Sequence, residues 1–370
     1  MTAASVPVDR VRAQIAAILA AWGMPEDLRA TTVEAMTYAD LAGIDSHGLS
    51  MLMMYEGGLH AGKLELAARP RVVREGPATA LLDAGAGLGH PAGVKAMRLA
   101  IEKALAVGVG AVAVRNSHHF GAAGYYAAMA PERGLLGLVA SSTRDVTVIP
   151  TRGTVPVLGT NPLAFAAPAG RNRPFLLDMS TSTAAANKVK VYELNGRPVP
   201  VGWVLDERGA PVTDPARAMD LVWRRTAARG GGLTPLGGAE ETGSHKGYGL
   251  GVMVQLLAST LAGASFSPVR RRDRGPDAPD DIGHLFLALD PRAFRGEGEF
   301  EQDADVVLDA LRACPAADPA LPVLVAGDPE AAARAARAEG TLPVPAALAE
   351  RIRAICDRCG AAFLLGGADP

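Results

Sequence analysis

The stretch Gly85-Ala86-Gly87-Leu88-Gly89-His90-Pro91 follows a strand-like segment and opens a helical one. Glycines in this setting are typical of the phosphate-binding turn of a Rossmann domain. That turn requires a third glycine three residues after the second, and here the position holds His90. The stretch is therefore more typical of a tight turn between a strand and a helix. A dinucleotide, if one binds to this chain, must be held by something other than the standard phosphate turn.

Around this turn, the sequence changes its character at Pro70. Apolar spacing before Pro70 predicts helices alone, over 8–22, 27–42 and 50–60. After Pro70, short apolar runs predict strands separated by helices. The expected strands are 78–83, 110–115, 135–141, 175–179 and 284–289. The expected helices are 90–107, 124–133, 245–263, 303–312 and 329–339.

The length of 370 residues exceeds what a single core usually serves, so two domains are the default expectation. The segment 223–280 is helical and rich in loops, and it is expected to pack back against the N-terminal helices. The prediction is a helical domain from 1–75 and 223–280, an α/β domain from 76–222 and 281–330, and a C-terminal helical segment over 331–370.

Composition and charge exclude several classes of protein. A net charge of −2 and an isoelectric point near 6.4 give no field that would hold nucleic acid or an anionic membrane. The basic run Arg270-Arg271-Arg272 stands among aspartates and is expected to be a solvated loop. The N-terminus lacks the pattern of a secretion signal, no apolar stretch suits a membrane span, and only three cysteines occur. We therefore expect a cytoplasmic protein without disulfides.

Three histidines stand in settings that favour chemistry. His47 lies in Asp45-Ser46-His47-Gly48 between two helical segments, and imidazole can pass a proton near neutral pH to an oxygen that gains charge. The alternative is a helix-capping cluster, since aspartate and serine both cap helices well. His118 and His119 follow a strand, among glycines and aromatics that suit the wall of a pocket. Neighbouring side chains on an extended segment face opposite sides, and no metal-ligand spacing accompanies them, so no metal site is predicted.

Other polar groups stand at the ends of predicted elements. Asp178 ends a strand, where it can orient an imidazole or cap the turn that follows. His245 and Lys246 open a long apolar helix, whose first N–H groups suit a phosphate; the alternative is an exposed lysine on a loop. The stretch Gly159-Thr160-Asn161-Pro162 is a turn by residue type, with a hydroxyl that can face an anion.

Taken in order, these motifs resemble the malate/L-lactate dehydrogenase family, which lacks a Rossmann fold and includes L-sulfolactate dehydrogenases, ureidoglycolate dehydrogenases and Δ1-piperideine-2-carboxylate reductases. The matching stretches are DSHG at 45–48, SHHFGAAGYY at 117–126, GTNPLAFAAP at 159–168, FLLDMSTS at 175–182, GRPVPVGWVLDERGAPVTDP at 196–215, PLGG at 235–238, HKGYGL at 245–250 and IGHLFLALDP at 282–291. The resemblance implies an α/β, non-Rossmann NAD(P)-binding domain with a largely antiparallel or mixed sheet, interleaved with a smaller, discontinuous helical domain. It also implies a homodimer, a small-molecule substrate, and NADH or NADPH as the cofactor.

The resemblance further assigns roles to residues. His47 resembles the general acid or base, Asp178 the carboxylate near the reacting centre and His119 the second histidine of the pocket, while His118 stands where asparagine is usual. The residues on stretches that resemble the cofactor site are Ser117, Thr160, Asn161, Ser180, Lys188, His245 and Lys246. The residues expected at the substrate are Ser46, Met51, Tyr55 and Arg144.

One departure from the family pattern concerns the substrate's carboxylate. An arginine usually stands four residues after the DSHG histidine; here the position holds Met51, and Met53 stands where proline is usual. Methionine cannot form the bidentate charged pair that arginine makes. Either the substrate is bulkier or less anionic than malate or lactate, such as a cyclic imine or a biosynthetic intermediate, or Arg144 supplies the missing cation. The rival hypothesis is a degenerate relative that acts as a binding or scaffold protein without turnover.

Overall fold

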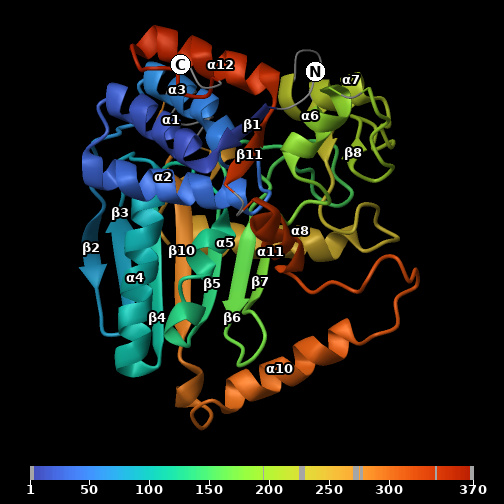
Figure 1. The fold of residues 1–370 in the computed structure, drawn as a ribbon. Helices are drawn as coiled ribbons and strands as arrows, with labels where there is room; N and C mark the ends of the chain where they lie inside the picture. The colour runs from blue at the N-terminus through green and yellow to red at the C-terminus, as the bar shows by residue number, and fades with distance from the viewer. Residues whose placement is uncertain are drawn as a thin grey trace.

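A seven-stranded sheet forms the centre of the computed structural model, which describes residues 4–194, 196–224, 230–269, 275, 278–337 and 340–366. The strand order is β2-β3-β4-β10-β5-β6-β7 (Figure 1). The strands are β2 (Arg71–Glu75), β3 (Thr79–Asp83), β4 (Val109–Ser117), β5 (Leu136–Ser141), β6 (Leu163–Ala167), β7 (Phe175–Met179) and β10 (Ile282–Leu289). Strands β3 and β4 run parallel, and every other neighbouring pair is antiparallel. The predicted fold class, an α/β protein with a largely antiparallel sheet, is confirmed.

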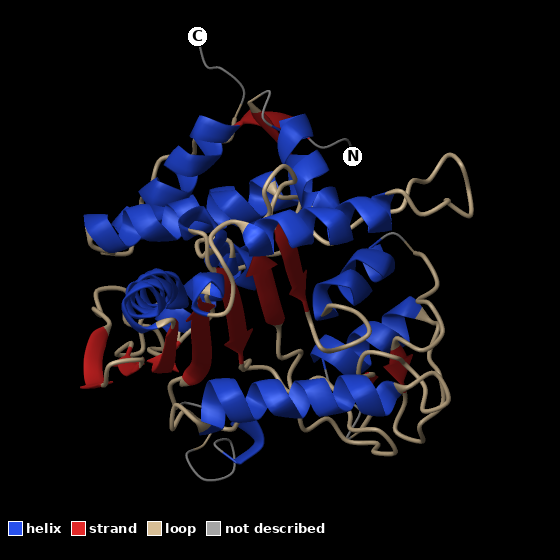
Figure 2. Ribbon diagram, turned by 90° about the horizontal axis from the view of Figure 1, so that it is seen from below, coloured by secondary structure: helices blue, strands red, loops and turns tan. Residues whose placement is uncertain are grey.

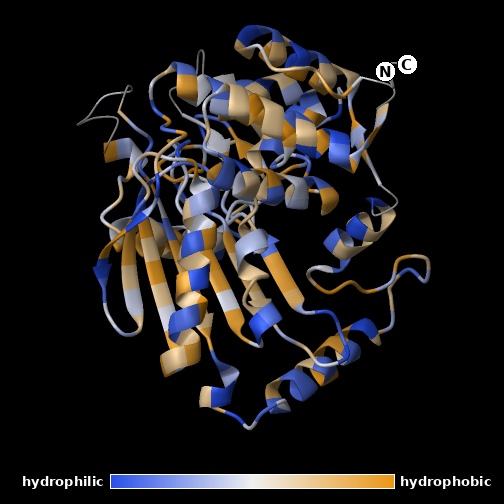
Figure 3. Ribbon diagram, turned by 60° about the vertical axis from the view of Figure 1, so that its left-hand side comes forward, coloured by the Kyte–Doolittle hydropathy of each residue, from blue (hydrophilic) through white to orange (hydrophobic). Residues whose placement is uncertain are grey.

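Helices cover both faces of this sheet (Figure 2). On one face, α4 (Gly89–Val107) connects β3 to β4 and buries Met97 against Val112 and Phe286 of the strands. On the other face lie α8 (Ser244–Gln255) and the π-helical turn η4 (Leu256–Thr260). Figure 3 shows apolar residues concentrated along the strands that these helices cover.

Helix α8 and η4 pack on the sheet, and the expected contact of 223–280 with the N-terminal helices stays a prediction. Ala258 of η4 packs on Ala113, Ala140 and Leu285 of the sheet. The small alanines leave room for a helix, and Gly283 lets the two backbones approach, because a Cβ there would lie 2.2 Å from the Ala258 carbonyl oxygen. The basic run Arg270-Arg271-Arg272 lies outside the described residues.

A separate helical layer joins the two ends of the chain. Its elements are β1 (Ala4–Pro7), α1 (Val8–Ala21), α2 (Glu26–Leu41), the 3-10 turn η1 (Leu49–Met51), α3 (Leu52–His60), β11 (Thr341–Val344) and α12 (Ala346–Cys359). Ile15, Met36 and Leu52 share one apolar core with Leu342 and Ile352, so the C-terminal helix packs directly on the N-terminal ones. The short pair β1–β11 means that the stretch before Pro70 is not entirely helical. The domain boundaries given above stay a prediction.

The smaller elements form a third apolar cluster beside the sheet. They are α6 (Ala186–Leu194), β8 (Val204–Leu205), α7 (Pro215–Met219), the π-helical turn η3 (Asp220–Arg224) and β9 (Gly232–Leu233). The helix expected over 124–133 is shorter, with α5 (Ala123–Ala127) followed by the 3-10 turn η2 (Pro131–Arg133). Pro131 lacks the N–H that an α-helix would need there, and Gly134 ends the turn in the left-handed region. Among the described residues, no helix combines the length and apolar character needed to cross a bilayer.

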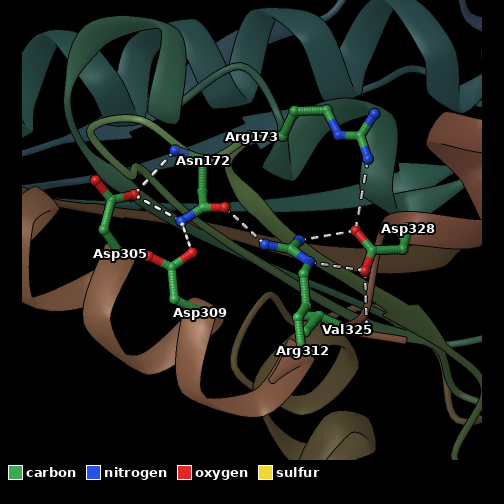
Figure 4. A network of polar contacts seen from close by, with 7 residues as sticks. All are labelled: Asn172, Arg173, Asp305, Asp309, Arg312, Val325 and Asp328. Carbon is green, nitrogen blue, oxygen red and sulfur yellow. Dashed lines mark hydrogen bonds and ion pairs between the residues drawn. The ribbon is translucent and has the colours of Figure 1, made fainter. Parts of the chain in front are cut away.

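Helix α10 (Glu299–Arg312) is held to the body by a polar network (Figure 4). The buried Asp305 carboxylate accepts hydrogen bonds from the backbone N–H groups of Arg171 (2.7 Å) and Asn172 (2.9 Å) in the β6–β7 turn. At the end of the helix, the Arg312 guanidinium forms a two-point pair with Asp328, the first residue of α11 (Asp328–Arg337), at 2.8 and 3.1 Å. The network therefore fixes the start of α11 against the sheet. The remaining 3-10 turn, η5 (Pro291–Ala293), follows β10.

Candidate active site

His47 lies on the turn that joins α2 to η1 and α3. The turn leaves α2 through Gly43, which has a φ of +78°, and the His47 N–H donates to the Ile44 carbonyl at 2.9 Å. The Ser46 hydroxyl lies 2.8 Å from Nδ1 of the His47 ring. Burial of the imidazole lowers the pKa of His47 to about 4, because the charged form loses its hydration. The ring is therefore neutral at pH 7, with Nδ1 engaged by a serine.

His119 stacks on His47, with ring centroids 5.4 Å apart and planes inclined by 30°. Its Nδ1 atom lies 2.9 Å from the Tyr55 hydroxyl and accepts the Gly121 N–H at 3.3 Å. Since a backbone N–H can only donate, Nδ1 is an acceptor, and the ring proton belongs on Nε2. Burial raises the pKa of Tyr55 above its ordinary value, so this side chain stays a phenol and donates. Burial likewise holds the pKa of His119 well below its ordinary value, and the ring is a neutral Nε2–H tautomer.

Five of the seven histidines gather around this stack. His90 and His118 lie edge-on to the Tyr55 ring, with centroids 5.8 and 6.3 Å from it. His118 Nε2 lies 2.9 Å from Asp280 Oδ2, and both side chains are buried. His90 is fully buried, and neither ring nitrogen has a hydrogen-bond partner within the described chain. Among the described residues, no three histidines, cysteines or acids are placed to hold a metal ion.

His284 is the fifth histidine of the cluster and is fixed by an aromatic ring and two serines. Its ring lies flat on Phe120, with centroids 4.4 Å apart, and its nitrogens lie 2.8 Å from the Ser141 hydroxyl and 2.9 Å from the Ser117 hydroxyl. Burial lowers the pKa of His284 to about 3, as it does for His90. Sequence reasoning missed both histidines as members of the site, because each sits in a segment typical of ordinary secondary structure. The order along the chain contains no signal that would bring them together.

Asp178 lies on β7 and faces α5. Its carboxylate accepts a hydrogen bond from the Gly124 N–H at 2.7 Å, so its partner is a backbone amide rather than an imidazole. Burial raises the pKa of Asp178 to about 6, although the Gly124 amide lowers it; Glu330 of α11 raises it further. Gly124 permits this contact, since a Cβ there would lie 3.0 Å from the carboxylate. Asp178 is thus a carboxylate that gains a proton in mildly acidic solution.

The residues predicted for the cofactor fall into two groups. Thr160, Asn161 and Ser180 meet where β6 and β7 adjoin α8: the Thr160 carbonyl accepts the Thr181 N–H at 2.9 Å, and the Asn161 amide donates to the Gly251 carbonyl at 2.9 Å. His245 and Lys246 lie exposed on the first turn of α8, and Lys188 is exposed on α6. Ser117 stands apart from these, because it is buried against His284.

These residues fit a nicotinamide dinucleotide. The Oδ1 atom of Asn161 is buried and lacks a hydrogen-bond partner within the described chain, which suits a ligand amide or hydroxyl. The exposed first turn of α8, with Lys246 on it, suits a pyrophosphate. The proposed pyrophosphate position is the N-terminus of α8, which is far in sequence from the glycines at 85–89. This agrees with the absence of a third glycine at position 90, which a Rossmann phosphate turn would require.

The structure also places the residues predicted for the substrate. Met51 is 9% exposed and packs in the core of the helical layer, so it does not line an open apolar surface. Arg144 lies 3.2 Å from the Asp145 carboxylate and 3.8 Å from Asp280, which contacts His118. Its positive charge helps to lower the pKa of His119, after burial and the neighbouring imidazoles. Arg144 is therefore close to the histidine cluster, although carboxylates of the chain already contact it.

Comparison with known proteins agrees with this description. The chain matches the malate/L-lactate dehydrogenase family over residues 6–353. It is 39% identical to a malate dehydrogenase of Pyrococcus abyssi over 83% of this chain and 82% of that protein. It is 33% identical to a Δ1-pyrroline-2-carboxylate reductase of Ancylobacter novellus over 92% of this chain and 94% of that protein. The crystal structure of malate dehydrogenase from Entamoeba histolytica superposes with a TM-score of 0.91 at 29% identity, covering 97% and 99% of the two chains.

The fold and the family match define an oxidoreductase that is not built on a Rossmann domain. More particularly, the chain belongs to the malate/L-lactate dehydrogenase family. The predicted family and enzyme class are thereby confirmed. Since relatives of similar identity are named for hydroxy acids and for an imino acid, membership leaves the substrate of this chain to be found by experiment.

Proposed function

We propose that this chain transfers a hydride between a nicotinamide cofactor and the C=O or C=N carbon of a small 2-oxo acid or cyclic imino acid, with His47 passing the proton. The observation that carries the proposal is the stack of His47 on His119, two partly buried neutral imidazoles with centroids 5.4 Å apart. Such a pair supplies one group that exchanges a proton and one that donates a fixed hydrogen bond. The bound cofactor supplies or accepts the hydride.

His47 is the proton carrier in this proposal. A neutral imidazole is ready to accept the proton of a hydroxyl or amine as hydride leaves the neighbouring carbon. In the reductive direction His47 must first be protonated, and its pKa of about 4 makes this costly at pH 7. The carboxylate of a bound substrate would offset part of that cost, because an opposite charge nearby favours the imidazolium. Substrate binding and protonation of His47 should therefore be coupled.

His119 is the hydrogen-bond donor of the pair. Gly121 and Tyr55 occupy Nδ1, so the proton on Nε2 is held in place before substrate arrives. A neutral imidazole that donates from a fixed nitrogen can polarise a carbonyl or imine without transferring its own proton. The low pKa of His119 supports this role, since the ring resists becoming a cation. Asp178 would favour positive charge near the centre when it is ionised.

The substrate is expected to be an acid whose carboxylate meets Arg144. The arginine that usually follows the DSHG motif is absent, and Met51, which stands at its position, is buried in the helical core. Arg144 is the cation that we propose in its place, because its charge lies close enough to His119 to lower the pKa of that ring. Ser46 and Tyr55 complete the proposed substrate residues through their contacts with the two imidazoles. A single paired cation suits a monocarboxylate, such as a cyclic imino acid, better than a dicarboxylate.

The cofactor contacts are proposed at the α8 end of the sheet. Asn161 would bind an amide or hydroxyl of the cofactor, Lys246 and the first turn of α8 its phosphates, and Thr160, Ser180, Lys188 and His245 would line the same end. Both NADH and NADPH remain candidates. A homodimer is likewise proposed on the family resemblance, and light scattering on the purified protein tests it. A cytoplasmic location is proposed on the low cysteine content, and fractionation of the source cells tests it.

A panel assay tests the proposal. NADH and NADPH are each offered with pyruvate, oxaloacetate, a sulfonated 2-oxo acid, 2,3-diketogulonate and two cyclic imino acids, and loss of reduced-nicotinamide absorbance is followed. Wild type is compared with His47→Ala and with His60→Ala, an exposed histidine at the end of α3. Turnover of a cyclic imino acid that only His47→Ala abolishes supports the proposal. Silence on every substrate together with failure to bind either cofactor would favour the rival, a degenerate binding protein.

A further inference from the structure

A buried carboxylate contacts the turn that carries His47 on the C-terminal side of this histidine. Asp40, on the last turn of α2, is 7% exposed, and its Oδ2 atom accepts the Leu49 N–H at 2.9 Å. Gly48 lies directly against this carboxylate, because a Cβ at Gly48 would sit 1.9 Å from Asp40 Oδ1. The carboxylate thus occupies the space that any side chain at position 48 would need. It fixes the backbone on the C-terminal side of His47.

An arginine far away in sequence contacts the same turn on the N-terminal side of His47. Arg337, at the end of α11, donates from Nη1 to the Asp40 carbonyl and to Asp45 Oδ1 at 2.5 Å, and from Nη2 to Asp45 Oδ2 at 3.3 Å. The Arg337 side chain is 17% exposed, so the pair is shielded from water on its cationic side. These contacts fix the backbone on the N-terminal side of His47. Their bidentate geometry sets direction as well as distance.

Helix α11 is itself fixed, so it can hold the turn rigidly. Its first residue, Asp328, is paired with Arg312 and accepts the Val325 N–H at 2.9 Å (Figure 4). Its middle packs on the turn, since a Cβ at Gly43 would lie 3.1 Å from the Ala333 Cβ. The helix thus joins the sheet at one end to the turn of His47 at the other.

We infer that Asp40 and Arg337 are positioning residues, which clamp the turn 45–49 from two sides and so fix the His47 ring against His119. Neither touches the reacting atoms; they act through the backbone that presents His47. The inference rests on the proposed role of His47. A displacement of about 1 Å at a catalytic group can cost about 100-fold in rate, so a clamp of this kind is expected to show in kcat.

The first test uses the contact between Asp40 and Gly48. Gly48→Ala forces the carboxylate aside, and Asp40→Ala removes it; each is expected to lower kcat by between about 10- and 100-fold. In the double variant the added methyl enters the space that the carboxylate has left, so its kcat should equal that of Asp40→Ala alone. Losses that multiply instead would show that the two positions act independently and would overturn the clamp.

The second test uses α11 and contains its own control. Arg337→Met is expected to lower kcat by about 10-fold or more, while Arg337→Lys recovers part of it, because one charged donor remains. Arg334→Met is the matched control, since Arg334 lies on the same helix, stacks on Tyr38 at 4.4 Å and forms no hydrogen bond with the turn. Cofactor affinity, followed by nicotinamide fluorescence, and melting temperature are measured for all three variants.

The clamp predicts that Arg337→Met loses kcat while its cofactor affinity stays within about twofold of wild type. Equal losses of kcat in the Arg337→Met and Arg334→Met variants, in step with their melting temperatures, would reduce Arg337 to a structural role. The clamp and the proposed function fail separately. If His47→Ala keeps full turnover, the proposed function falls; if His47→Ala is inactive but the clamp variants keep kcat, only the clamp falls.

Discussion

Replacing Tyr55 with phenylalanine tests the assignment of the proton on His119. Tyr55 is fully buried, and within the described part of the chain its hydroxyl has one hydrogen-bond partner, His119 Nδ1 at 2.9 Å. The substitution removes a single oxygen and keeps the ring that packs against His90 and His118. Loss of one buried hydrogen bond of this kind costs about 1 kcal/mol of unfolding free energy.

The effect on activity follows from the tautomer. In wild type the Gly121 N–H, at 3.3 Å, requires Nδ1 to accept, and the Tyr55 hydroxyl then donates to the same atom at 2.9 Å; in the variant only the longer Gly121 contact remains. If the lost bond favoured the Nε2–H tautomer by about 1 kcal/mol, the preference for it weakens by about fivefold. We expect kcat/KM to fall by between about 2- and 10-fold, with little change in cofactor affinity.

Nitrogen-15 NMR of the histidine rings reads the tautomer directly, and steady-state kinetics with the best substrate of the panel reads the consequence. Wild type should show a protonated Nε2 on His119, and Tyr55→Phe a mixture of tautomers. A wild-type ring protonated on Nδ1 would refute the reasoning, whatever the kinetics. So would a variant whose His119 tautomer shifts while kcat/KM stays the same, because the donor role would then be unsupported.

Three further predictions concern pH, the substrate and the α10 network. The pKa values of His47, His90 and His284 are lowered in the fold, so the unfolded chain takes up protons first as pH falls below 6.5. The free energy of unfolding should therefore fall as pH falls toward 3, by on the order of 1 kcal/mol per pH unit and histidine. In a plot of melting temperature against pH, His90→Leu should decline less steeply than wild type below pH 6.5, and an equal decline would count against this account. Arg144→Ala should raise the KM for the carboxylate substrate at least tenfold and leave cofactor affinity unchanged, and an unaltered KM would remove Arg144 from the substrate site. Asp305→Ala should lower the unfolding free energy by about 1–2 kcal/mol and keep kcat, since two partly buried backbone N–H groups lose their acceptor. Loss of activity without loss of stability would contradict this account of the α10 network.

Sequence patterns predicted the elements whose apolar residues face the core. Helix α4 and strands β4, β5 and β10 were expected to within two residues, because the apolar residues of α4 recur at the helical period and those of the strands form short, largely buried runs. Strand β2 was missed because all of its residues are exposed at the edge of the sheet, so no alternation marks it. Strand β6 was missed because its alanines are too small to give a strong apolar signal.

The site divides in a similar way. The roles of His47 and His119 came from resemblance to the family, and the structure then brought the two rings together. His284 joins the cluster through a pairing with Ser117 across 167 positions of sequence, and Arg337 reaches Asp45 across 292. Local patterns contain no record of such contacts, because the sheet order and the return of the C-terminal segment create them. The motif alone could not predict that Met51 is buried, because its burial results from the packing of the helical core.

The central claim is that hydride and proton are delivered to one substrate, with His47 as the proton carrier. It is tested most directly by single-turnover reaction of cofactor deuterated at the nicotinamide C4 with a cyclic imino acid, followed by mass spectrometry of the product. The account predicts one deuterium in the product of wild type and none above background with His47→Ala, although that variant still binds the reduced cofactor. Deuterium transfer by His47→Ala at the wild-type rate would contradict it.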